Sequence, residues 1–466
     1  DIKEKTRPGP LEVMSEARKG DFKARKFGGI EKRRQLILDR QKKARRDLAQ
    51  HARALATTGV SDKETLEDVL ENAQELKEEK EVATGESMID DKADGKEGKV
   101  NWRREKRISY AKQLTYPDWL IQDYMPNDLA KNWSAIPRPE GVRCLVISNR
   151  GTTVSRKRTG AILHRFSSSL PSGCPMKKGD RNKECILDCI FHPFNQTYYV
   201  LDLMCWKGEH LYDSTMEFRQ FWIHSKLSET SVDKVSQHNE YRFWPLPCFS
   251  CTPANLLQAY APNDHVSGSE PKMGPHGFQQ DGILLYHKES HYELGLSPLV
   301  LLWKDQFCAR FFVDTTDGLN VTPLQVCTLS VHSDGTIRTA EEHVLATVSP
   351  DMMAQLQLHN GDLCKFSIKG LDLANDRAAS VNFLGNASKA RVVADSWGKL
   401  VFQWTARNGT NIPFVDLLNL VGGSAHLPPQ HQQLVAELEQ KREQQQQHFR
   451  TQLQQIAQHL QQPQQQ

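Results

Sequence analysis

The sequence predicts an α+β protein whose folded centre lies between polar, charged ends. Short runs of β-branched and aromatic residues, separated by turn residues, begin near residue 102. Examples are residues 143–148, 197–202 and 281–286. Residues 214–224 lie between such runs and have the composition of a helix. Many short strands with few helices are typical of antiparallel sheets, so we expect an antiparallel α+β domain over residues 102–304.

The length of 466 residues predicts two or three domains, and a hydrophobic content of 38% is sufficient for a core. No apolar run approaches the roughly 18 residues that cross a bilayer, so no membrane partner is expected. Ten cysteines without regular spacing indicate a reduced, intracellular setting. Only Cys248 and Cys251 form a C-x-x-C pair. Without a second pair nearby, two buried thiols are a better interpretation than a zinc site.

The charge is separated along the N-terminal part of the chain. Residues 1–60 hold 17 Lys and Arg against 8 Asp and Glu, whereas residues 61–99 hold 6 against 14. Such blocks are typical of interaction segments. We expect residues 1–29 to form a flexible basic arm and residues 57–101 to form an acidic helix, over 62–82, followed by a disordered linker.

Residues 30–56 contain no Gly or Pro, and their apolar residues fall on one narrow face of a predicted helix. Basic residues surround this helix: Lys32, Arg33, Arg34, Arg40, Lys42, Lys43, Arg45, Arg46 and Arg53. A solvated helix face, an RNA-binding helix and a nuclear localisation signal are the alternatives. Because no folded segment adjoins it in the sequence, we expect an acidic receptor as its partner, with the acidic helix covering it beforehand.

The C-terminal third is predicted to contain two further segments. Residues 305–427 are β-rich, with turns at 333–335 and 360–362, and are expected to form a second small domain. Residues 428–466 form a Gln-rich tail, for which an amphipathic helix and disorder both remain open.

The tryptophans and arginines of the central domain are candidate ligand-binding residues. Most of the tryptophans are expected in the core. A positively charged methylated guanine would stack favourably on an exposed indole, and nearby cations would hold its phosphates. Basic residues cluster on adjoining predicted strands: Arg138, Arg143, Arg156, Lys157 and Arg158.

Several motifs resemble those of the snurportin family, adaptors that import spliceosomal small nuclear ribonucleoproteins. They are Ile186-Leu-Asp-Cys-Ile190, Asn195-Gln-Thr-Tyr-Tyr-Val-Leu-Asp202, Met204-Cys-Trp206, His224-Ser-Lys-Leu227 and Asp281-Gly-Ile-Leu-Leu-Tyr-His-Lys288. The resemblance covers about residues 20–56 and 108–304. It implies a domain that binds the trimethylguanosine cap of U snRNA in snRNPs, and an importin-β-binding helix over 30–56. It also implies shuttling between nucleus and cytoplasm, an export receptor as a further candidate partner, and no cofactor or metal.

The cap-binding domain of this family is itself similar to the nucleotidyltransferase domain of messenger RNA capping enzymes and DNA ligases. The K-x-D-G element of those enzymes, which carries the attacking lysine, corresponds to Arg138-Pro-Glu-Gly141. Arginine stays protonated near neutral pH and cannot be that nucleophile. Their metal-binding L-D-G-E element corresponds to Leu187-Asp-Cys-Ile190, which lacks the final carboxylate. We therefore expect no catalysis, with an active guanylyltransferase or ligase-like enzyme and a general RNA-binding protein as alternatives.

The resemblance also implies the cap contacts. They are Trp303 as the stacking residue, Trp119 and Arg143 at matching positions, and Arg158, Tyr116, Pro117 and Arg138 where the family has other residues. Trp303 falls one residue later than in the family, and in a strand one residue changes the face. A bulge would restore its direction, whereas the alternative is a core tryptophan. Residues 305–427 resemble, in their order after the cleft domain, the OB-fold domain of capping enzymes, with a faint likeness to its closing motif at 401–404 and 411–413; an unrelated β extension is the alternative.

Overall fold

The computed structural model describes most of the chain. The described residues are 29–43, 48–61, 107–175, 183–260, 276–314, 324–373, 376–388, 391–425 and 427–461. Within these ranges, no helix has the length and apolar character needed to cross a lipid bilayer. The predicted acidic helix over 62–82 lies outside the described residues.

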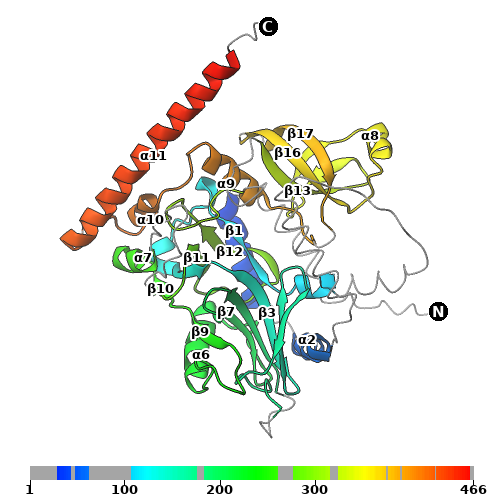
Figure 1. Cartoon of the computed structure of the whole chain (residues 1–466), viewed down its shortest axis with the longest axis vertical. Helices are drawn as coiled ribbons and strands as arrows, with labels where there is room; N and C mark the ends of the chain where they lie inside the picture. The colour runs from blue at the N-terminus through cyan, green and yellow to red at the C-terminus, as the bar shows by residue number, and fades with distance from the viewer. Residues whose placement is uncertain are drawn as a thin grey trace.

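Two sheets form the central domain (Figure 1). The first has the order β1 (Thr115–Trp119), β12 (Gly295–Trp303), β11 (Gln280–His287), β2 (Trp133–Pro139) and β10 (Phe249–Ser250). The second has the order β5 (Ile162–Phe166), β4 (Thr152–Lys157), β3 (Val142–Asn149), β6 (Cys185–His192), β7 (Thr197–Trp206) and β8 (Glu209–His210), with β9 (Arg242–Pro245) beside β7. Pairing is antiparallel except for β1 with β12 and β7 with β9. The predicted α+β class is confirmed.

The two sheets are joined by a shared hydrophobic core, because alternate residues of a strand point to opposite faces. Ile136 of β2 and Leu284 of β11 belong to the same buried cluster as Ile190 of β6 and Leu201 of β7. Helix α6 (Met216–Ser228) packs against β7 and β9, and α7 (Pro253–Ala259) packs against β2 and β10.

The predicted basic helix over 30–56 is described as two helices, over residues 29–43 and α2 (Ala49–Ser61). Contrary to our expectation, both have a folded neighbour. Ala52 and Ala56 of α2 are fully buried in a cluster with Leu145 and Ile147 of β3. The expectation was wrong because the surface that receives α2 lies more than fifty residues further along the chain.

A third sheet follows, in the order β15 (Val344–Thr347), β14 (Thr336–Arg338), β13 (Gln325–Val331), β16 (Leu363–Asp372) and β17 (Arg377–Asn386). It is curled, so that its edge strands β15 and β17 approach each other (Figure 1). Short helix α8 (Pro350–Gln355) accompanies this sheet. The motif at 401–404 lies in α9 (Trp397–Arg407), whose apolar residues share one core cluster with the central domain.

The chain then forms α10 (Phe414–Leu420) and α11 (Pro429–Gln461). For the Gln-rich tail the structure has the helix rather than the disordered alternative. Val435 and Leu438 anchor the start of α11 in the core, and its remaining length projects from the body (Figure 1).

Gly141, in the turn between β2 and β3, has a φ of +145°, and a Cβ there would lie 2.3 Å from the Phe191 carbonyl oxygen. We expect Gly141→Ala to lower the free energy of unfolding by at least about 3 kcal/mol, measured by denaturant titration. Gly385 is a matched control, because its φ is +143° but nothing lies within 4 Å. Gly385→Ala should cost about 1 kcal/mol. Equal losses for the two variants would contradict the steric explanation.

Candidate functional site

Three neighbouring strands of the first sheet bring Arg138, Asp281 and Lys304 together. Arg138 lies near the end of β2 and forms an ion pair with Asp281 of β11. Lys304, directly after β12, donates from Nζ to Asp281 Oδ1 at 2.5 Å. Burial, followed by repulsion from Arg138, lowers the pKa of Lys304 well below its usual range. Arg138 and Lys304 thus share one carboxylate, an arrangement of cations suited to an anionic ligand.

The glycine of the Asp281-Gly282 pair allows this close approach. Gly282 has a φ of +102°, and a Cβ would lie 2.4 Å from the carbonyl oxygen of Trp303. On the adjacent turn, the Glu140 N–H donates to the Gln279 carbonyl at 2.7 Å. Burial raises the pKa of Glu140, although Arg310, Lys304 and Arg138 act in the opposite direction. The turn that carries Arg138 is thus fixed to β11.

Arg143 forms a two-point ion pair with a buried carboxylate, that of Asp188. Its Nε and Nη2 donate to the two oxygens of Asp188 at 3.0 and 2.6 Å, and the Tyr292 hydroxyl donates to the same carboxylate at 2.8 Å. Burial lowers the pKa of Arg143, but the charge and hydrogen bonds of the adjacent Asp188 carboxylate raise this pKa above its usual range. Burial, and then repulsion from Arg143 and Arg158, lowers the pKa of Arg138. The three predicted arginines therefore act on one another electrostatically.

Arg158 is exposed, and its guanidinium lies over the ring of Tyr116, 4.7 Å from the ring centroid. Tyr116 and Pro117 are both half-buried on β1, next to β12. The Tyr116 hydroxyl donates to the Ala111 carbonyl at 2.6 Å. One face of the Arg158 guanidinium thus lies on the Tyr116 ring, and the N–H groups at the edge of the guanidinium can contact a ligand.

Trp303 does not face these residues, and the predicted exposed orientation is wrong. Its side chain is 1% exposed, and its indole N–H donates to the Ile412 carbonyl at 3.0 Å. Its ring lies 5.8 Å from that of Tyr260 and 5.6 Å from that of Phe414. The β1–β12 register does shift between Pro117 and Asp118, as a bulge requires, but the shift leaves Trp303 in the core. Residues 412–414, far along the chain, cover this tryptophan.

Trp119 is half-buried in β1 and lies close to the cationic group. The Lys304 ammonium is 5.8 Å from its ring centroid, and the Phe402 ring of α9 is 4.5 Å away. The site therefore contains Trp119, Arg138, Arg143, Arg158 and Tyr116, with Pro117 beside them. Sequence reasoning omitted Asp281 and Lys304 from the site, although both lie in or beside quoted motifs, and the Asp-Gly pair was the available signal.

The predicted receptor-binding residues differ in how far they are buried. Arg33 and Arg34 are buried, and Arg34 donates to the carbonyls of Pro298 and Tyr124 at 3.1 and 2.6 Å. Lys32, Lys42, Lys43 and Arg53 are exposed, Arg40 is half-buried, and Arg45 and Arg46 lie outside the described residues. Three of these basic residues form ion pairs with carboxylates of the central domain. The carboxylates are those of Asp118 for Arg33 at 3.7 Å, Glu293 for Arg40 at 3.3 Å and Glu289 for Lys42 at 3.0 Å.

The two packed sheets bring guanidinium and ammonium groups together at their strand ends, an arrangement typical of domains that hold anionic ligands. Comparison with protein families specifies the class further. Residues 113–305 match the family model described as Snurportin1, m3G cap-binding domain. This match confirms the family resemblance that was predicted from the motifs.

Solved structures that resemble the chain include DNA ligases. A mycobacterial DNA ligase D complexed with ATP and MES is 10% identical, with a TM-score of 0.27, and the match covers 62% of this chain and 99% of that one. The ligase domain of M. tuberculosis LigD is 12% identical, with a TM-score of 0.28 and coverages of 61% and 98%. At TM-scores below 0.5, these similarities give no information about activity.

Removing the charge of Asp188 should destabilise the domain, because Arg143 would remain buried without a counter-charge. We expect Asp188→Asn to lower the free energy of unfolding by about 3–5 kcal/mol. Asp334→Asn is the control, since Asp334 forms an exposed pair with Arg338, and it should change the free energy of unfolding far less than Asp188→Asn. Chemical denaturation of both variants tests this, and a small effect of Asp188→Asn would contradict it.

Proposed function

We propose that this chain is a nuclear import adaptor that binds the trimethylguanosine cap of spliceosomal U snRNPs and links them to importin-β. The observation that supports cap binding most directly is the cluster of Arg138, Arg143, Arg158 and Lys304 within the matched cap-binding domain. A cap has a charged base and a negatively charged phosphate bridge. An adaptor of this kind would shuttle between nucleus and cytoplasm, with an export receptor as a further candidate partner.

In this proposal the cap base stacks on Trp119 and not on the buried Trp303. A base on the Trp119 ring would place its phosphates near Lys304, whose ammonium is 5.8 Å from that ring. Arg138, near the end of β2 in the first sheet, and Arg158, directly after β4 in the second sheet, would then both contact the phosphate bridge. A methylated base carries a positive charge, so its attraction to the electron-rich indole would distinguish a methylated cap from an unmethylated one.

A second candidate function is enzymatic nucleotidyl transfer, and one observation favours it. Lys304 is a buried lysine whose pKa is lowered, as in lysines that act as nucleophiles. Against it, Arg138 occupies the position of the attacking lysine and is in an ion pair with Asp281. The Lys304 ammonium is bound to the same carboxylate, which favours its charged, non-nucleophilic form.

Tryptophan fluorescence should be quenched more strongly by a trimethylguanosine cap dinucleotide than by the monomethyl and unmethylated forms. We expect Trp119→Phe to abolish the preference and Trp303→Phe to retain it. Arg158→Ala should weaken binding about tenfold, because it loses a charge-assisted contact. Arg242→Ala is the matched control, since Arg242 is an exposed arginine on β9.

Other outcomes of this experiment would contradict the proposal. Equal binding of all caps, or equal competition by uncapped RNA, would indicate a general RNA-binding protein. A covalent adduct with labelled nucleoside triphosphate and divalent metal, absent from Lys304→Arg, would favour the enzyme.

The receptor-binding part of the proposal requires the basic helix to leave the domain. A receptor that wraps a helix contacts all its faces, whereas Arg33, Arg34, Ile37 and Leu38 are buried here. Glu293 accepts hydrogen bonds from Arg40 at 3.3 Å and from Gln41 at 3.0 Å, so it holds the end of the helix in place. Docking and receptor binding should therefore compete.

Weakening the docked state should strengthen receptor binding. We expect Glu293→Ala to bind importin-β several-fold more tightly than the unaltered chain, as measured by calorimetry at constant salt. Glu289→Ala should have little effect, because the ion pair of Glu289 with Lys42 is exposed. Unchanged affinity in Glu293→Ala would exclude competition by this contact, and failure of every variant to bind importin-β would refute the receptor link.

A further inference from the structure

Three side chains of different chemistry meet at the edge of the second sheet, away from the candidate cap site. Glu184 immediately precedes β6, Cys205 lies near the end of β7, and His210 ends β8. Cys205 and His210 are direct partners in the antiparallel pairing of β7 and β8, so their side chains lie on the same face. The Gly208 N–H donates to the Glu184 carbonyl at 3.0 Å and fixes Glu184 beside the β7–β8 turn.

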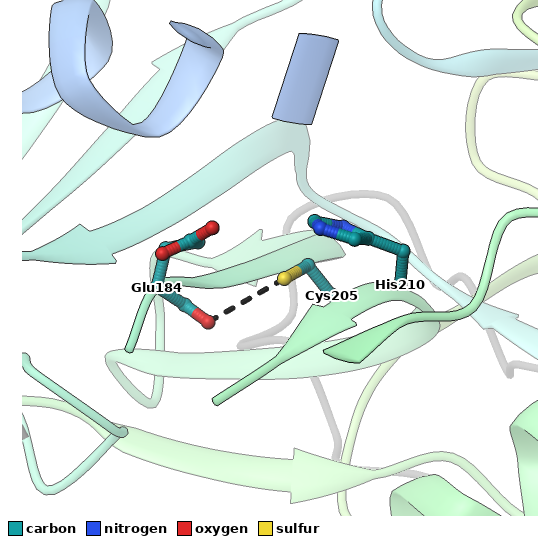
Figure 2. Close-up of side chains that lie close together, drawn as sticks. All are labelled: Glu184, Cys205 and His210. Carbon is teal, nitrogen blue, oxygen red and sulfur yellow. Dashed lines mark hydrogen bonds between the residues drawn. The ribbon is translucent and has the colours of Figure 1, made fainter. Parts of the chain in front are cut away.

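The donor atoms of these residues are close together and largely shielded from water. One carboxylate oxygen, one sulfur and one imidazole nitrogen all lie within 4.8 Å of one another (Figure 2). Glu184 is 6% exposed and Cys205 is fully buried, whereas His210 is half-buried. Glu184 Oε1 is buried and has no hydrogen-bond partner among the described residues. A buried carboxylate oxygen without a partner is costly unless a cation or proton donor satisfies it.

We propose that Glu184, Cys205 and His210 bind a divalent transition-metal ion, and that the ion is Zn²⁺. Thiolate, imidazole and carboxylate are the ligands that zinc uses in proteins. Tetrahedral zinc places its donor atoms roughly 3.5 Å apart, so side-chain rotations that bring these donors together by roughly 1 Å complete the site. Water fills the fourth position.

The charges and the proton balance are consistent with such a site. Two anionic ligands, a thiolate and a carboxylate, neutralise the double charge of the ion, so the buried site carries no net charge. Without metal, burial and then the nearby Glu184 raise the pKa of the Cys205 thiol to about 12. The thiol donates to the Glu184 carbonyl at 3.5 Å, as the dashed line in Figure 2 shows. Metal binding breaks the S–H bond, forms a metal–sulfur bond and releases one proton to solvent.

A metal here would join β6, β7 and β8 beneath the N-terminal helix. Cys205 belongs to the same buried cluster as Leu48, Ala52 and Leu55 of the α2 region. The Cys248 and Cys251 pair does not provide a comparable site, because no cluster of three potential ligands includes it within the described ranges. The proposal does not depend on cap binding, since the ligands lie outside the cationic group around Arg138.

The test is Co²⁺ titration of the reduced, metal-free full chain, followed by displacement with Zn²⁺. We expect one equivalent of Co²⁺ to produce a thiolate-to-cobalt charge-transfer band, which Zn²⁺ removes, and we expect Zn²⁺ to raise the melting temperature. Cys205→Ala should lose the band. Cys189→Ala is the matched control, because Cys189 is another fully buried cysteine of the same sheet, and it should retain the band.

Glu184→Gln decides the question if Cys205→Ala does not fold, as judged by circular dichroism. It should keep the charge-transfer band but bind Co²⁺ at least about tenfold more weakly. Absence of the band from the unaltered chain, its persistence in folded Cys205→Ala, or unaltered affinity in Glu184→Gln would overturn the proposal.

Discussion

The neutralisation of two facing aspartates is the constraint on which the central domain depends. Asp188 of β6 and Asp202 of β7 are direct partners in the strand pairing, and both are almost fully buried. Two like charges opposite each other would destabilise the sheet. Each is instead held by a guanidinium, since Arg143 binds Asp188 and Arg219 of α6 binds Asp202 through both oxygens. The same pairs fix the direction of Arg143 and attach α6 to the sheet.

The remaining cations of the site are arranged around this neutral centre. Arg138 and Lys304 share the carboxylate of Asp281, and Arg158 rests on Tyr116, so these cations lie at the strand ends. Burial and repulsion from Arg143 and Arg158 destabilise the protonated form of Arg138, and an anionic ligand would stabilise it. The basic N-terminal helix is held differently, because Asp118 and Glu293 of the central domain form ion pairs with Arg33 and Arg40, and the Tyr124 carbonyl accepts from Arg34. The two basic regions therefore differ in which groups of the domain compensate them.

The sequence allowed the fold class, the family of the central domain and most of the cationic residues to be predicted. Gly141 and Gly282 both lie in motifs taken from the sequence, whereas their positive φ and the collision that a Cβ at either would cause come from the structure. The orientation of Trp303 could not be predicted, because it depends on Ile412 and Phe414 covering the first sheet from a later segment. The docking of Arg34 on Pro298 and Tyr124 was missed for the same reason, since residues distant in sequence supply the acceptors.

By itself, the sequence determined the features that depend on local chemistry. These are the alternation of strands, the glycines at tight turns, the replacement of a nucleophilic lysine by Arg138 and the basic character of residues 30–56. Only the tertiary structure decided which of these residues meet. It buried Trp303, left Trp119 beside Lys304, placed the basic helix against the domain and brought Glu184 to Cys205 and His210. The physical reason is that exposure and charge compensation depend on contacts between segments far apart in the chain, which local patterns do not specify.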